Sequence, residues 1–208
     1  MTPTFLRFAV AMGLSLLVLL GACARTEPAR FYTLRPLAGA ELKQPSGSAH
    51  IATDALAIGV ASVELAAYLD RPEIATRRGP YQVHFADFDR WAEPLHDNIA
   101  QVLTDNLSAL LPSETIQVFP QAAGAQLDYH LTVSGLRFDN IPGDEALLRA
   151  HWTVWDGNER NRLIARKVAY REPLPEQDYD SIAAANSRLL ASLSRDIAEA
   201  IDALLAVE

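Results

Sequence analysis

The chain has 208 residues, of which 50% are apolar and 21% are charged, so it is long enough for one well-packed globular domain and short for two. Its formal net charge of -8 argues against nucleic acid as the main partner, because a phosphate-binding face needs a clustered excess of basic residues. The single cysteine excludes an internal disulfide bond, so the domain must be stabilised by its core.

The N-terminus has the features of an export signal. Arg7 precedes an apolar run from Phe8 to Leu20, which is too short for a membrane-spanning helix. The run ends in Leu20-Gly21-Ala22-Cys23, which resembles the bacterial lipobox. The resemblance implies that Cys23 takes a diacylglyceryl group and becomes the first residue after cleavage. An ordinary signal peptide with a chance cysteine is the alternative, but the lone thiol would then need its own explanation.

These signals divide the chain into a lipoprotein signal peptide at residues 1–22, a lipidated tether at 23–30 and a single domain at 31–208. More than one acyl chain on Cys23 would give firm membrane attachment, whereas a single chain binds only marginally. Ala24 stands where an aspartate would resemble the signal for retention in the inner membrane. We therefore predict a protein anchored in the outer membrane of a Gram-negative bacterium and facing the periplasm.

The first half of the domain predicts strands, a hairpin and one long helix. Apolar or alternating runs indicate strands at residues 31–34, 55–65, 74–77 and 81–85. A turn at Gly79-Pro80 joins the last two as a hairpin, and the Gly-, Pro- and Ser-containing residues 38–50 predict an exposed loop. Pro94 is tolerable only in the first turn of a helix, and apolar residues then recur at helical spacing until Pro112.

The second half predicts a group of strands followed by a helix. The strands are expected at residues 116–119, 127–139, 146–155 and 163–170. Asp156-Gly157-Asn158 is a strong hairpin signal, so the last three strands form a meander. Pro173 and Pro175 break the strand pattern before a helix at residues 179–206. Its predicted apolar face consists of Ile182, Leu189, Leu190, Leu193, Ile197, Ile201, Leu204 and Leu205.

Together, these elements predict the α/β class. Two long amphipathic helices, each burying one face, would pack on a mixed sheet of about six strands whose meander is antiparallel. We expect a single domain with this layered arrangement.

No motif for catalysis or metal binding stands out. The histidines lack metal-ligand spacing such as H-E-x-x-H, and there is no nucleophile elbow or P-loop. His130 and His151 could face each other across adjacent strands, an arrangement far commoner than a zinc site. Asp70 and Glu93 could be paired acids, but Asp70 more simply caps the turn before Pro72 and Glu93 favours the positive end of a helix. We expect no enzyme activity, metal or cofactor.

Arginines are concentrated in one part of this acidic chain, at Arg71, Arg77, Arg78 and Arg90. They could form a structural network with the neighbouring acids, which are Asp70, Asp87, Asp89 and Glu93. They could instead meet an acidic partner or lipid head groups, to which the planar guanidinium is well suited. We predict a mixture, with Asp70 and Arg71 as a structural pair or a subunit contact. Trp91 is more typical of a lid on the core than of an exposed anchor.

Two segments carry a resemblance to a known family. Tyr68-Leu69-Asp70-Arg71-Pro72, the downstream Arg77 and Arg90-Trp91-Ala92-Glu93-Pro94-Leu95 resemble the signature of the ABC-type transport auxiliary lipoprotein family, which includes PqiC-like lipoproteins of paraquat-inducible systems. The similarity covers nearly the whole mature chain, including the pairs Arg137-Phe138 and His151-Trp152. Leu65-Ala66-Ala67 departs from the family pattern, which has a proline before the tyrosine, and this affects local turn geometry only.

The resemblance implies a periplasmic lipoprotein of a mammalian-cell-entry (MCE) type lipid transport system, with MCE-domain subunits as partners at the outer-membrane end. It also implies a three-layer α/β fold of the anticodon-binding or TolB N-terminal type, and homo-oligomeric rings in some members. The candidates for a partner or assembly surface are Tyr68, Asp70, Arg71, Arg77, Arg90, Trp91 and Glu93.

Two functional hypotheses follow. The first is a non-catalytic docking or assembly subunit of an MCE-type transporter. The second is a lipid-binding carrier that holds an acyl chain between the sheet and a helix, which requires an apolar pocket of about 300–1,000 Å³. An enzyme ranks third, because no residues can be named for its chemistry.

Overall fold

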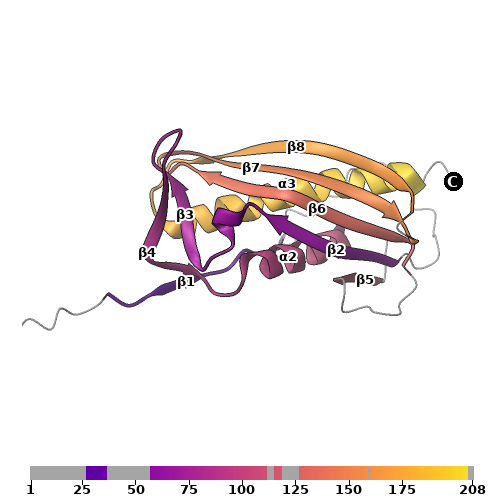
Figure 1. Ribbon diagram of the computed structural model, residues 1–208, viewed down its shortest axis with the longest axis horizontal. Helices are drawn as coiled ribbons and strands as arrows, with labels where there is room; N and C mark the ends of the chain where they lie inside the picture. Colours follow the sequence, from indigo (N-terminus) through magenta and orange to yellow (C-terminus); the bar gives the residue numbers. More distant parts are fainter. Residues whose placement is uncertain (1–26, 37–56, 112–114, 119–126, 159, 206–208) are drawn as a thin grey trace, which may run out of the picture.

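The computed structural model describes residues 27–36, 57–111, 115–118, 127–158 and 160–205 (Figure 1). The predicted signal peptide, Cys23 and the predicted loop at residues 38–50 lie outside these ranges.

A small sheet forms one end of the domain. It contains β1 (Arg30–Tyr32), β3 (Glu73–Arg77) and β4 (Val83–Trp91), in the order β1-β4-β3. β3 and β4 are antiparallel, which confirms the predicted hairpin, and Gly79 in their turn has a φ of 116°. β1 runs parallel to β4, so the first strand after the tether is also the outer strand of this sheet.

A longer sheet of five strands spans the rest of the domain. Its strands are β2 (Ala57–Leu65), β5 (Thr115–Val118), β6 (Tyr129–Asn140), β7 (Asp144–Asp156) and β8 (Arg162–Leu174). Their order is β5-β2-β6-β7-β8. β5 and β6 are parallel to β2, and β6, β7 and β8 form the predicted antiparallel meander. β8 continues past its predicted end through Pro173, which an edge strand tolerates because it has only one hydrogen-bonded neighbour.

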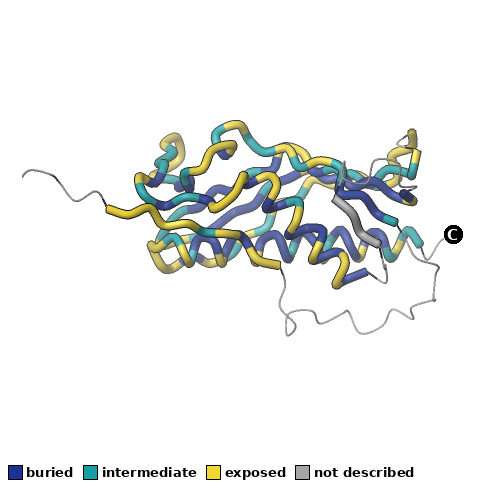
Figure 2. The backbone as a smooth tube through the Cα atoms, turned by 90° about the horizontal axis from the view of Figure 1, so that it is seen from below, coloured by how far each residue is buried: buried dark blue, intermediate teal, exposed yellow. Residues whose placement is uncertain are grey.

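The two predicted helices are α2 (Leu95–Leu110) and α3 (Tyr179–Leu205), and a short 3-10 helix, η1 (Ala67–Leu69), follows β2. α2 packs on β2 and β5, α3 packs on β7 and β8, and the two helices touch each other. Helices and strands therefore form two separate layers (Figure 2).

The predicted class, a single mixed α/β domain with two long amphipathic helices, is confirmed. The strands form two sheets rather than one, however, and among the described residues both helices pack on one face of the long sheet. The reason is connectivity. β6, β7 and β8 follow one another directly, so no helix intervenes to cover the second face, and an antiparallel meander tolerates solvent there.

The space between the sheet and the helices is filled by apolar side chains. Trp152, Phe138 and Leu131 of the sheet are at most 2% exposed, and they belong to the same buried core as Leu193 and Ile197 of α3, which are fully buried. Along the whole length of α3, buried residues recur at helical spacing and exposed residues lie between them (Figure 2). The core thus uses one face of the long sheet, and no helix in the described ranges covers the other face, which we call the open face.

Candidate assembly surface and sheet junction

Tyr68 and Arg77 join the two sheets. Arg77, at the end of β3, places Nη2 2.7 Å from Asp139 Oδ1 of β6 and donates to the same oxygen from Nε at 2.8 Å. The Tyr68 hydroxyl donates to Asp139 Oδ1 at 3.3 Å, and the Arg77 guanidinium lies 5.5 Å from the centre of the Tyr68 ring. Burial and then the charge of Asp139 raise the pKa of Tyr68, so its hydroxyl stays protonated at neutral pH. These half-buried residues hold the fold.

Arg71 and Arg90 share a carboxylate on the neighbouring surface. Arg71 Nε donates to Glu73 Oε2 at 2.9 Å, and Arg90 Nη2 lies 3.9 Å from Glu73 Oε1. The Arg71 guanidinium also covers the Phe85 ring, 3.8 Å from its centre. The hydrogen bond from Arg71 lowers the pKa of Glu73. Asp70 and Arg71 do not form the structural pair considered from the sequence, because Arg71 bonds to Glu73 instead. A subunit contact through these two residues stays a prediction.

The remaining signature residues separate into exposed and buried ones. The side chain of Asp70 is 74% exposed, 3.9 Å from His96, and Glu93 is exposed just before α2. Trp91 is only 6% exposed and belongs to the core, as its residue type indicated. We call Asp70, Arg71 and Glu93, which are exposed, together with the half-buried Arg90, the signature surface.

No sequence pattern pointed to the contact that holds β1. Arg30 Nε and Nη2 donate to Asp89 Oδ1 and Oδ2 of β4 at 2.6 and 2.9 Å, and the Tyr32 hydroxyl donates to Asp89 Oδ1 at 2.8 Å. Asp89 is 3% exposed. In the sequence, Asp89 is only one of the acids close to the clustered arginines, and nothing connects it with Arg30.

This contact shifts the pKa values of Asp89 and Tyr32. The hydrogen bond from Arg30 lowers the pKa of Asp89 below its ordinary value of 3.8, against the opposing effect of burial. Burial, with the contact to Asp89, raises the pKa of Tyr32 to about 12.

We expect Asp89→Asn to be less stable than wild type at pH 7, with a difference that closes in acid. A lowered folded-state pKa gives stabilisation that is present above the unfolded value of 3.8 and is lost as the pH falls through the folded value. The thermal midpoint should drop by about 3–8 °C at pH 7 and converge with wild type below about pH 3, as followed by calorimetry. Asp87→Asn, an exposed change on the same strand, is the control. A gap that stayed constant down to pH 2 would contradict this role.

The two histidines do not face each other. In the β6–β7 ladder, His130 is opposite Trp155 and His151 is opposite Ser134, so the predicted cross-strand pair is wrong. Within the described ranges, no group of three or more His, Cys, Asp or Glu residues is arranged to hold a metal ion. Among the helices that the structure describes, none combines the length and apolar character needed to cross a membrane.

These features define a small two-layer α/β domain that has an ion-paired junction between its sheets and an exposed, charged signature surface. A family model described as an ABC-type transport auxiliary lipoprotein component matches residues 32–198, and the chain belongs to this family. It is therefore a lipoprotein that serves as an auxiliary component of a transport system. No curated protein matches the chain significantly.

Solved structures share the fold. A crystal structure of an uncharacterized protein has a TM-score of 0.67 and 20% identity, covering 84% of this chain and 99% of its own. Protein XCC0632 from Xanthomonas campestris has a TM-score of 0.64 and 15% identity, covering 86% and 99%. A PelC dodecamer from Paraburkholderia phytofirmans is more distant, with a TM-score of 0.43, 11% identity and coverage of 74% and 95%.

Proposed function

We propose that this chain is a non-catalytic accessory subunit of an MCE-type intermembrane lipid transport system. It is anchored in the outer membrane through acylated Cys23, faces the periplasm and contacts its partner through the signature surface. Membership of the transport auxiliary lipoprotein family is the observation that carries the proposal.

The position of the tether supports this assignment. Cys23 precedes Arg30 by seven residues (30 − 23), a span of about 25 Å at most for an extended chain. Arg30 is bonded to Asp89 in β4, the strand that also carries Arg90. The small sheet therefore stays within about 25 Å of the lipidated residue, and the signature surface would be held close to the membrane. β1, which carries Arg30, lies at this same end of the domain (Figure 1).

A carrier that holds an acyl chain between sheet and helix is the alternative. Fully buried side chains such as Trp152 and Leu193 occupy that layer, which favours the docking role. Native mass spectrometry of the purified lipoprotein separates the two functions. A ring that purifies without lipid in the layer between sheet and helices supports docking, whereas a monomer that co-purifies with stoichiometric lipid in that layer supports the carrier.

The signature surface is tested by charge reversal. We expect Arg71→Glu to abolish co-purification with the MCE-domain subunit or ring formation, because it replaces a cation that an acidic partner surface would meet. The melting midpoint should change by only about 3 °C or less, since Arg71 is exposed and surface ion pairs contribute little. Arg162→Glu, an exposed change on β8, is the matched control. Assembly that is equally strong in Arg71→Glu and wild type would exclude Arg71 from the contact.

A further inference from the structure

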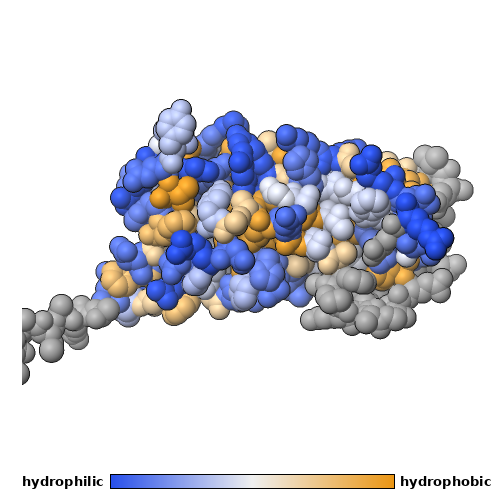
Figure 3. All heavy atoms as spheres, viewed as in Figure 1, coloured by the Kyte–Doolittle hydropathy of each residue, from blue (hydrophilic) through white to orange (hydrophobic). Residues whose placement is uncertain are grey.

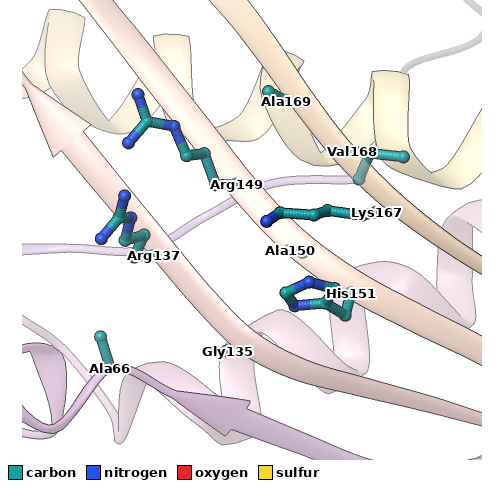
Figure 4. Close-up of a pocket in the computed structure, with 9 residues that line it drawn as sticks. All are labelled: Ala66, Gly135, Arg137, Arg149, Ala150, His151, Lys167, Val168 and Ala169. Carbon is teal, nitrogen blue, oxygen red and sulfur yellow. The ribbon is translucent and has the colours of Figure 1, made fainter.

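The open face of the long sheet carries a hollow of about 600 Å³. Arg137 of β6, Arg149 of β7 and Lys167 of β8 surround it, and small or apolar residues form its floor, including Gly135, Ala150 and Ala169. Figure 4 shows the three cationic side chains standing on one side of the sheet, with the helices behind it. In the space-filling view of this face, an apolar area lies among hydrophilic side chains (Figure 3).

A bulge in β6 shapes this hollow. The β6–β7 register shifts between Ser134 and Arg137, and Gly135 within the bulge has a φ of 60°, which glycine adopts most readily. A bulge re-aims the side chains that follow it and bends its strand. Here it places Arg137 directly opposite Arg149.

This juxtaposition costs stability, because like charges directly opposite each other on paired strands repel. Lys167 is likewise opposite His151 in the β7–β8 ladder. The carboxylate of Asp139 lies 3.6 Å from Arg137 and 3.8 Å from Arg149. It lies closer to Arg77, at 2.7 Å, and therefore compensates the other two arginines only weakly.

The local charge balance is positive in an acidic protein. Arg137, Arg149 and Lys167 line the hollow, and Asp139, the carboxylate that two of them approach, is already paired with Arg77. Within the described part of the chain, Lys167 has no ion pair or hydrogen bond from its side chain. The side chains of Arg137 and Arg149 are 40% and 42% exposed, so their remaining donors are accessible to a ligand.

We infer that this hollow binds the phosphate-bearing head group of an anionic phospholipid. Two guanidinium groups and an ammonium match the several oxygens of a phosphodiester, and the guanidinium fork binds it in a bidentate way. The apolar floor suits the glycerol and first acyl carbons better than a free inorganic ion. The volume lies within the range of small-molecule sites, about 300–1,000 Å³, and is too small for a folded partner. This site deepens the proposed transport role and rests on it for its biological meaning.

Native mass spectrometry of the full lipoprotein in a neutral detergent tests the site, with dioleoylphosphatidylglycerol as the probe. We expect one lipid per chain in wild type and binding at least about tenfold weaker in Lys167→Gln, which removes a cation without breaking an ion pair. Arg149→Gln should weaken binding similarly. Arg162→Gln, an exposed arginine of β8 outside the hollow, should bind within about twofold of wild type.

Two further ligands identify the group that is recognised. Dioleoylglycerol has the same acyl chains without the phosphate and should not bind at this site, and inorganic phosphate should not displace the lipid at equal concentration. Equal binding of dioleoylglycerol, displacement by inorganic phosphate, or unchanged affinity in both variants would each overturn the inference. Docking through Arg71 requires none of these results, so failure of this site and failure of the proposed function are distinguishable.

Discussion

Leu193→Asp should unfold the domain. Leu193 is fully buried in α3, within the core between the helices and the long sheet. The substitution removes an apolar side chain, which costs about 2–5 kcal/mol, and adds the cost of burying an unpaired carboxylate. The sum is comparable with the whole stability of a domain, about 5–15 kcal/mol. Circular dichroism and thermal melting of the purified lipoprotein should show no cooperative transition, or one lowered by more than about 10 °C.

Ala184→Asp provides the control, because Ala184 is exposed on the same helix and the change introduces the same charge. It should melt within about 3 °C of wild type. If Leu193→Asp melted like Ala184→Asp, the assignment of the buried face of α3 would be wrong.

Asp139→Ala should have the second largest effect, because it leaves Arg77, Arg137 and Arg149 around the junction without their shared carboxylate. Removing one partner of a fully buried pair costs about 3–5 kcal/mol. We expect about 1–3 kcal/mol here, since two of the three arginines are 40% and 42% exposed and solvent screens them. Denaturant unfolding should report this loss as a lower midpoint with an unchanged slope.

A double-mutant cycle measures the interaction between Arg77 and Asp139 separately from the other effects of each substitution. Arg77→Ala with Asp139→Ala should be less destabilised than the sum of the single changes, because the remaining charge is no longer left unpaired. Asp144→Ala, an exposed acid at the start of β7, should be close to neutral. Strict additivity of Arg77→Ala and Asp139→Ala would show that the junction does not depend on their contact.

Much of the fold could be predicted because its patterns are local. The β3–β4 hairpin follows from Gly79-Pro80 and the alternation on either side, and α2 begins just after Pro94 because proline is excluded from a helix interior. The buried face of α3 follows from apolar spacing, with Ile182, Leu189 and Leu193 fully buried as predicted.

The errors arose where pairing between distant segments decided the outcome. β4 runs on to Trp91, past its predicted end, because β1 pairs with it and because the Trp91 N–H donates to the Pro72 carbonyl at 2.7 Å. Asp89, considered from the sequence as a partner of the nearby arginines, is instead the buried partner of Arg30, which precedes it by 59 positions. Neither contact leaves a periodic trace in the sequence.

The candidate sites divide in the same way. The sequence by itself determined the family signature, and it predicts the lipobox around Cys23 and the short tether, because each is a contiguous motif. Only the tertiary structure decided that Trp91 is core while Asp70, Arg71, Arg90 and Glu93 are surface. It alone also gathered Arg137, Arg149 and Lys167 around one hollow, because strand register, set by a bulge and two hairpins, brings together residues that lie 12 and 18 positions apart (149 − 137 and 167 − 149).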